Sequence, residues 1–123
     1  MWTYSIASGI MTDNGGIAGH TFQGYSGAGI GKNNVSLMDV SNVGPIPVGM
    51  YSMGTPEMES THGPFAIPLI PSPLNVMFGR CGFMLHGDSL EYPGCASHGC
   101  IIISPRLDRE LIYDSGQQIQ VVP

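Results

Sequence analysis

Two short apolar stretches decide the fold, namely Phe83-Met84-Leu85-His86-Gly87-Asp88 and Ser97-His98-Gly99-Cys100-Ile101-Ile102-Ile103. The first predicts a strand over Phe83–His86 that ends on a histidine. The second predicts a strand over Cys100–Ile103 that begins on a cysteine, and its three consecutive isoleucines indicate burial on both faces. We therefore expect the imidazole at the end of one buried strand to lie near the thiol at the start of another.

The composition of the 123-residue, 13.0 kDa chain favours strand and loop over helix. Its 18 glycines and 10 prolines are about twice the usual share and leave little room for long helices. A hydrophobic content of 42% with only 11% charged residues excludes a disordered chain. No apolar run approaches the length of a membrane span. We expect one domain, residues 1–123, that is mostly β with one short C-terminal helix.

The remaining elements are read from local patterns. Asn-Gly supplies the positive φ of a tight turn, so Asp13-Asn14-Gly15-Gly16 predicts a hairpin between Ile10–Thr12 and Ile17–Gln23. The glycine-rich residues 24–34 and the proline-rich residues 54–79 are expected to be loops. Further strands are expected at Thr3–Ala7, Met50–Met53 and Ile119–Val122.

One helix is predicted near the C-terminus. Ser104 suits its N-cap, Pro105 its first position and Gly116 the position just past its end. An apolar stripe predicts which residues face inward and which face water. Inward we expect Leu107, Leu111 and Ile112, and toward water Arg106, Asp108, Arg109 and Glu110.

The cysteine and histidine form a candidate nucleophile and base. A cysteine attacks as its thiolate, and a neighbouring imidazole can take its proton. The flanking Gly87 and Gly99 allow a substrate backbone to approach closely, and the amides of Gly99 and Cys100 are candidates for an oxyanion hole. Asp88 either orients His86, orders a loop or binds substrate, or is an exposed loop carboxylate.

Other site classes fit the sequence less well. With 4 basic against 9 acidic residues and a net charge of −5, no basic cluster favours nucleic acid or an anionic membrane. Gly31-Lys32 is followed by Asn33, so no P-loop is formed, and we interpret the segment as a surface loop lining a substrate groove. The groove candidates are Tyr25, Ser26, Lys32 and Asn33. We interpret His20 and His62 as surface or structural residues.

A structural zinc site is the non-enzyme alternative. Chemically suitable ligands are present, but no paired C-x-x-C motif is. These ligands are Cys81, Cys95, Cys100, His86 and His98.

At these residues the chain resembles the L,D-transpeptidases of the YkuD type, and within them the small type VI secretion L,D-transpeptidase effectors. The resemblance is carried by Leu85–Asp88 followed by Ser97–Ile101, and His86 lies 14 positions before Cys100. This spacing is shorter than in the housekeeping enzymes and favours the effector branch. Supporting segments are Trp2–Tyr4, Gly24–Gly27, Gly31–Asn34, Val43–Tyr51 and Val121–Pro123.

The resemblance implies an L,D-transpeptidase-like β-sandwich or barrel and a cysteine enzyme without a cofactor. Cys100 would be the nucleophile and His86 its base, with the carbonyl of Gly87 steering the imidazole. Gly99, Ser97, His98 and Asp88 would support or orient these groups. On a strand, His98 would point to the same side as Cys100.

The implied substrate is a peptidoglycan stem tetrapeptide, attacked at the L,D bond after meso-diaminopimelate. The enzyme would release the terminal D-alanine as an L,D-carboxypeptidase or exchange it for another D-amino acid. A phage lysis enzyme, a wall amidase or endopeptidase, and a zinc-stabilised wall-binding module remain alternatives.

An effector of this kind acts in the periplasm of a target bacterium after delivery. Residues 1–5 lack the features of a secretory signal, so we expect synthesis in the cytoplasm and transport by a secretion system. The partners would be a secretion-system component and a cognate immunity protein. In an oxidising periplasm Cys81 and Cys95 could pair and leave Cys100 free.

Overall fold

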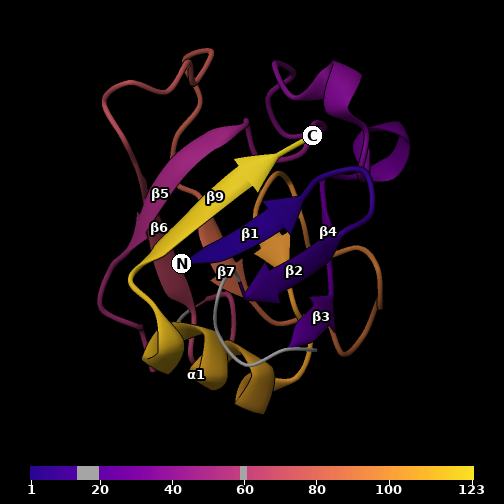
Figure 1. Ribbon diagram of the computed structural model, residues 1–123. Coiled ribbons are helices and arrows are strands. Elements are labelled where there is room, and N and C mark those ends of the chain that lie inside the picture. Colours follow the sequence, from indigo (N-terminus) through magenta and orange to yellow (C-terminus); the bar gives the residue numbers. More distant parts are fainter. Residues whose placement is uncertain (14–19, 59–60) are drawn as a thin grey trace.

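The computed structural model describes residues 1–13, 20–58 and 61–123. In these residues nine strands form one sheet, in the order β3-β2-β1-β9-β5-β6-β7-β8-β4 (Figure 1). The strands are β1 (Trp2–Ser5), β2 (Ile10–Asp13), β3 (Thr21–Gln23), β4 (Tyr25–Ser26), β5 (Gly49–Met53), β6 (Ile67–Pro71), β7 (Met84–His86), β8 (Ile101–Ile102) and β9 (Gln118–Val122). Two 3₁₀ turns, η1 (Gly29–Gly31) and η2 (Val35–Leu37), and one helix, α1 (Arg106–Ser115), complete them.

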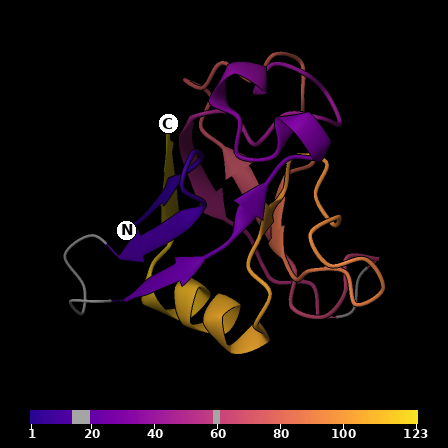
Figure 2. The same ribbon diagram turned by 90° about the vertical axis from the view of Figure 1, so that its right-hand side faces the viewer.

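The sheet curls into a nearly closed barrel. Its two edge strands, β3 and β4, are consecutive in the chain and separated only by Gly24. Helix α1 lies across one end of the barrel, and the 3₁₀ turns lie at the opposite end (Figure 2). The expected fold class, mostly β with one helix near the C-terminus, is confirmed.

The barrel is closed around an apolar core that the strand alternation builds. In β1, Trp2 and Tyr4 are fully buried while their neighbours are half-buried, as the two-residue period of a strand requires. Leu85 of β7 and Ile101 of β8 face the same core. The other core residues are Ile6, Met11, Ile46, Tyr51, Met53, Phe65, Ile67, Leu69, Phe83, Ile103, Ile112, Ile119 and Val121.

Two strands arise where the sequence predicted loops. β6 lies within residues 54–79, and β4 lies within residues 24–34. The prolines of β6 are tolerated because the ladder uses other groups. The amide of Leu69 donates to the Phe83 carbonyl at 2.9 Å, and the Pro68 carbonyl accepts from the Gly54 amide at 2.8 Å.

The N-terminal hairpin is present as a pair of antiparallel strands, with Met11 of β2 opposite Phe22 of β3. The predicted Asn14-Gly15 turn lies outside the described residues. The predicted strands at the N-terminus, at Met50–Met53 and at the C-terminus correspond to β1, β5 and β9.

The helix differs from its prediction in its caps and in its buried face. Pro105, not Ser104, is the N-cap residue, and no side chain caps the helix. Gly116 is extended, with φ −177°, so it forms no left-handed cap. Arg109 is only 2% exposed while Leu107 is 77% exposed. The helix buries Arg109 because the fold offers its guanidinium backbone carbonyls, as described below. No helix in the described ranges has the length and apolar character needed to cross a membrane.

Candidate active site

β7 and β8 pair in parallel, with Leu85 opposite Ile101 and His86 opposite Ile102. His86 is the last residue of β7 and Cys100 immediately precedes β8, so the two candidate residues belong to neighbouring segments of the sheet. Cys100 itself lies at a bend, and no hydrogen bond joins it to His86 in the described residues.

His86 is held by its own backbone neighbour. The ring is 3% exposed, and its Nδ1 lies 2.9 Å from the Gly87 carbonyl oxygen. Because a carbonyl only accepts, the neutral ring carries its proton on Nδ1, which leaves Nε2 as the basic atom. Burial lowers the pKa of His86 below its ordinary 6.5; the Gly87 hydrogen bond and the Asp88 carboxylate oppose this shift, while the neighbouring His62 and Arg109 add to it. The ring is therefore neutral at neutral pH.

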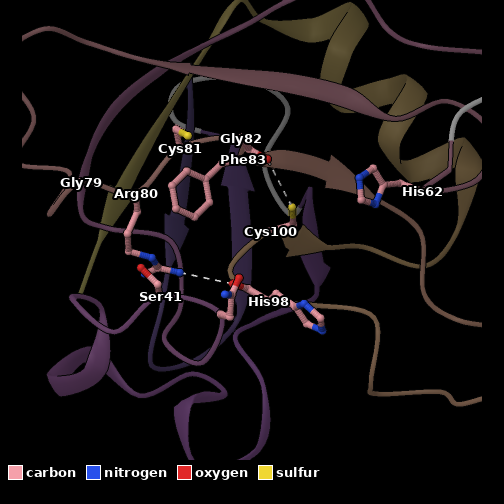
Figure 3. Close-up of a pocket in the computed structure, with 10 residues that line it drawn as sticks. Ser41, His62, Gly79, Arg80, Cys81, Gly82, Phe83, His98 and Cys100 are labelled. Atoms are coloured by element: carbon pink, nitrogen blue, oxygen red, sulfur yellow. Dashed lines mark hydrogen bonds between the residues drawn. The ribbon is translucent and has the colours of Figure 1, made fainter.

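Cys100 lies at the rim of a cavity of about 340 Å³. Its Sγ is 4.0 Å from the Gly82 carbonyl oxygen (Figure 3). Burial raises the pKa of the Cys100 thiol above its ordinary value, while a Met84 backbone hydrogen bond and the charge of Arg80 oppose that rise. The Cys100 thiol and the His86 imidazole are therefore both neutral at neutral pH.

Arg80 supports the cysteine from within the protein. It is 8% exposed, and its guanidinium lies over the Phe83 ring at 5.1 Å. Its Nη1 donates to the carbonyls of Met38 and Pro45, at 2.6 and 2.7 Å. Its Nη2 donates to the carbonyls of Gly44 at 3.0 Å and of His98 at 3.3 Å (Figure 3). Arg80 is therefore a buried cation of the site that no sequence motif indicated.

Ser97 organises the turn that presents the cysteine. Its buried Oγ accepts from the amides of Gly27 and Gly99, at 2.9 and 3.0 Å, and donates to the Cys100 carbonyl at 2.6 Å. In this structure the Gly99 amide donates to Ser97, which leaves the Cys100 amide as the available one of the two expected oxyanion donors. His98 is exposed and lines the cavity with Cys100, but it precedes β8 and is not a strand residue.

Asp88 orders the loop between β7 and the cysteine. Its Oδ1 accepts from the Tyr25 hydroxyl at 2.6 Å and from the Ser89 amide at 2.8 Å, and both carboxylate oxygens accept from the Gly94 amide. Although burial acts the other way, these hydrogen bonds and the charge of Lys32 lower the pKa of Asp88. The carboxylate is thus ionised and structural.

Two of the four expected groove residues face the Asp88 loop. The Tyr25 hydroxyl also accepts from the Ala96 amide at 2.9 Å. Lys32 extends over the Tyr25 ring at 4.4 Å and donates to the Gly94 carbonyl at 2.6 Å.

The other two groove expectations do not hold in this form. Ser26 is fully buried; its Oγ accepts from the Ile46 amide at 2.9 Å and donates to the Gly99 carbonyl at 2.8 Å. Asn33 is half-buried, and its Oδ1 accepts from the Ser26 amide at 3.1 Å. The polar atoms of both side chains are thus engaged within the protein. Ser26 binds the Gly99 carbonyl next to the cysteine, and Asn33 binds the Ser26 amide.

His62, interpreted from the sequence as a surface or structural residue, is exposed and lies against the candidate site. Its ring stacks on His86, with centroids 4.7 Å apart and planes 29° apart. It lines the cavity of Cys100 and also a second cavity of about 390 Å³ that His86 lines. The interpretation as a surface or structural residue missed this because stacking between residues 24 positions apart leaves no local pattern.

The remaining cysteines do not pair. Cys81, Cys95 and Cys100 are all free thiols, and the first two are exposed. The Cys81–Cys95 pairing that an oxidising periplasm would allow is not formed in this structure. Among residues 1–13, 20–58 and 61–123, no group of three His, Cys, Asp or Glu side chains is arranged to hold a metal.

The barrel and its parallel β7–β8 pair define an L,D-transpeptidase fold. The chain is similar to the crystal structure of Mycobacterium tuberculosis L,D-transpeptidase 1, with a TM-score of 0.58 and 19% identity, over 99% of this chain and 60% of that one. A family model for the Tlde1 domain matches residues 20–122. The chain belongs to this family of type VI L,D-transpeptidase effectors. No curated protein sequence matches it.

Proposed function

We propose that this chain, as a single domain of residues 1–123, acts on peptidoglycan stem tetrapeptides at the L,D bond after meso-diaminopimelate. It releases the terminal D-alanine as an L,D-carboxypeptidase or exchanges it for another D-amino acid. The observation that supports the proposal is the parallel pairing of β7, which ends at His86, with β8, which Cys100 immediately precedes, next to two cavities that these residues line.

The geometry supports a two-step acyl transfer. Nε2 of His86 takes the Cys100 proton as Sγ bonds to the carbonyl carbon of diaminopimelate, and the Cys100 amide is the candidate oxyanion donor. The C–N bond to D-alanine breaks as His86 returns that proton to the departing amine. Water or an amine then attacks the thioester, His86 takes its proton, the C–S bond breaks, and the thiol is restored.

Membership of a type VI effector family supports delivery to the periplasm of a target bacterium. It also supports an immunity protein and a secretion-system component as partners. A phage lysis enzyme or a wall amidase or endopeptidase with the same residue pair remains the second candidate, and the position of the cleaved bond separates the latter two from our proposal.

The test is incubation with purified tetrapeptide muropeptides, with and without a free D-amino acid, followed by mass spectrometry. We expect loss of one alanine, or its replacement by the added amino acid. Cys100→Ser should reduce the rate by about 10⁴-fold or more. His86→Gln should reduce it by about 10²–10⁴-fold, the usual contribution of a general base.

Cys81→Ser is the matched control because it removes an exposed thiol from the same cavity. It should retain most of the activity. Turnover by Cys100→Ser at the wild-type rate would overturn the mechanism, and cleavage at another bond would assign the chain to the amidases or endopeptidases.

A further inference from the structure

The stacked histidine pair is the least explained feature of the site. The ring centroid of His62 lies 4.7 Å from that of His86. His62 also lines both cavities, the one that Cys100 lines and the one that His86 lines. It is exposed while His86 is 3% exposed. The outer ring therefore covers the inner ring from solvent.

The position of His62 is built by the protein and is not that of a loose loop. Arg109 donates to the Pro64 carbonyl at 2.9 Å through Nη2 and to the Phe65 carbonyl at 3.2 Å through Nε. The backbone is left-handed at Gly63, directly after His62, with φ 87°. It is left-handed again at Phe65, with φ 56°. A non-glycine residue keeps such a conformation only when its surroundings impose it.

The same arginine supports His86. A Cβ atom at Gly87 would lie 2.9 Å from Nη1 of Arg109, so the guanidinium packs directly against the residue whose carbonyl holds Nδ1 of His86. One buried cation thus fixes the backbone beneath both rings. The stack is a consequence of how these two segments are anchored (Figure 2, where residues 61–66 and the loop after β7 lie side by side).

We propose that His62 is a positioning residue for His86, whose ring it covers and holds in the plane that presents Nε2 to Cys100. The inference rests on the proposed function, because it assigns His86 the role of base. His62 need not touch the reacting atoms. Its ring excludes water from one face of the imidazole and restricts the rotation of that imidazole.

The charges around the pair decide how its pH dependence should behave. His86 faces His62, Arg109 and Asp88, and Cys100 immediately precedes the neighbouring strand β8. Around His62, the charged and titratable cavity residues are Arg80, Cys81, His98 and Cys100 on one side and Asp88 and Cys95 on the other. Removal of the His62 ring exposes His86 and deletes the electrostatic interaction with His62 that lowers its pKa, and both changes raise the pKa of His86.

The experiment compares His62→Ala with His62→Phe, which keeps a stacking ring but carries no charge. For His62→Ala we expect kcat on tetrapeptide muropeptides to fall about ten- to a hundredfold, the usual cost of a misplaced group. Its acid limb of kcat/KM should move to higher pH. His62→Phe should restore most of the lost kcat.

A second measurement is independent of turnover, namely titration of the His86 ring protons by NMR in each variant. We expect the apparent pKa of His86 to rise in His62→Ala and to rise less in His62→Phe. Unchanged titration and an unmoved acid limb in His62→Ala would overturn the proposal. Equal loss of kcat in both variants would also overturn it, because that result would make the imidazole itself essential. Failure of the wild type to process muropeptides would refute the proposed function while the NMR titration still tested the stack.

Discussion

The two halves of the site rest on two buried arginines that differ in where they come from. Arg80 lies in the loop between β6 and β7 and supports the cysteine, whereas Arg109 lies in α1 and supports the histidine. In the described parts of the chain neither forms an ion pair with a carboxylate. Each instead donates four hydrogen bonds to backbone carbonyls.

The same charge has opposite consequences in the two places. The Arg80 cation lowers the pKa of Cys100 and so favours the charged form of the nucleophile. The Arg109 cation lowers the pKa of His86 and so favours the neutral form of the base. One residue type can therefore prepare both a nucleophile and a base, because a nearby cation stabilises a thiolate and destabilises an imidazolium.

The largest expected effect is on the stability of the protein, and it differs between the two arginines. Arg109→Met should lower the free energy of unfolding by about 3 kcal/mol or more, since it leaves buried carbonyls such as that of Ile103 without a donor. Arg80→Met should cost less, because its acceptors include Met38, in a loop that can open to water. Urea denaturation followed by circular dichroism measures both, and an equal or reversed loss would show that the loop is as rigid as the helix.

A smaller effect is expected at the two glycines that adjoin the arginines. A Cβ at Gly99 would lie 2.5 Å from Nη2 of Arg80, and φ there is 134°, so Gly99→Ala is both crowded and strained. At Gly87 the three atoms nearest to a Cβ would all belong to the Arg109 guanidinium, with Nη1 the closest at 2.9 Å. We expect losses of about 2 kcal/mol and about 1 kcal/mol, respectively. Thermal unfolding checks the order, and a costlier Gly87→Ala would refute this account of Gly99.

The smallest effect concerns pH. Arg80→Met removes a charge that lowers the thiol pKa, so alkylation of Cys100 by iodoacetamide should need a higher pH than in the wild type. Arg109→Met removes a charge that lowers the pKa of His86, so the acid limb of kcat/KM, which lies below pH 6.5 in the wild type, should move upward. Arg80→Lys and Arg109→Lys are the matched controls that keep the charge. If either single variant shifted both the pH dependence of Cys100 alkylation and the acid limb of kcat/KM, the two arginines would not act separately on the cysteine and the histidine.

The sequence predicted the parts of the molecule whose signals are local. The apolar runs before His86 and after Cys100 have the lengths of buried strands, and those strands form the pair that joins the two residues. It did not predict Arg80, Arg109 or His62, because their partners are backbone carbonyls or a distant ring, which leave no pattern in a sequence. Arg109 was expected on the water face because a charged residue in a helix is usually exposed. β6 was missed because its prolines normally exclude a strand, and only the sheet shows which amides the ladder leaves unused.

Strand β4 has a consequence for how the protein behaves in concentrated solution. Its two residues pair with Ile101 and Ile102 and so cover the outer edge of the strand that follows the nucleophile. An uncovered apolar edge there would be a template for a second chain and a route to aggregation. The two edges of the described sheet are thereby left to β4 and β3, which are only two and three residues long, and strands this short offer little surface for intermolecular pairing.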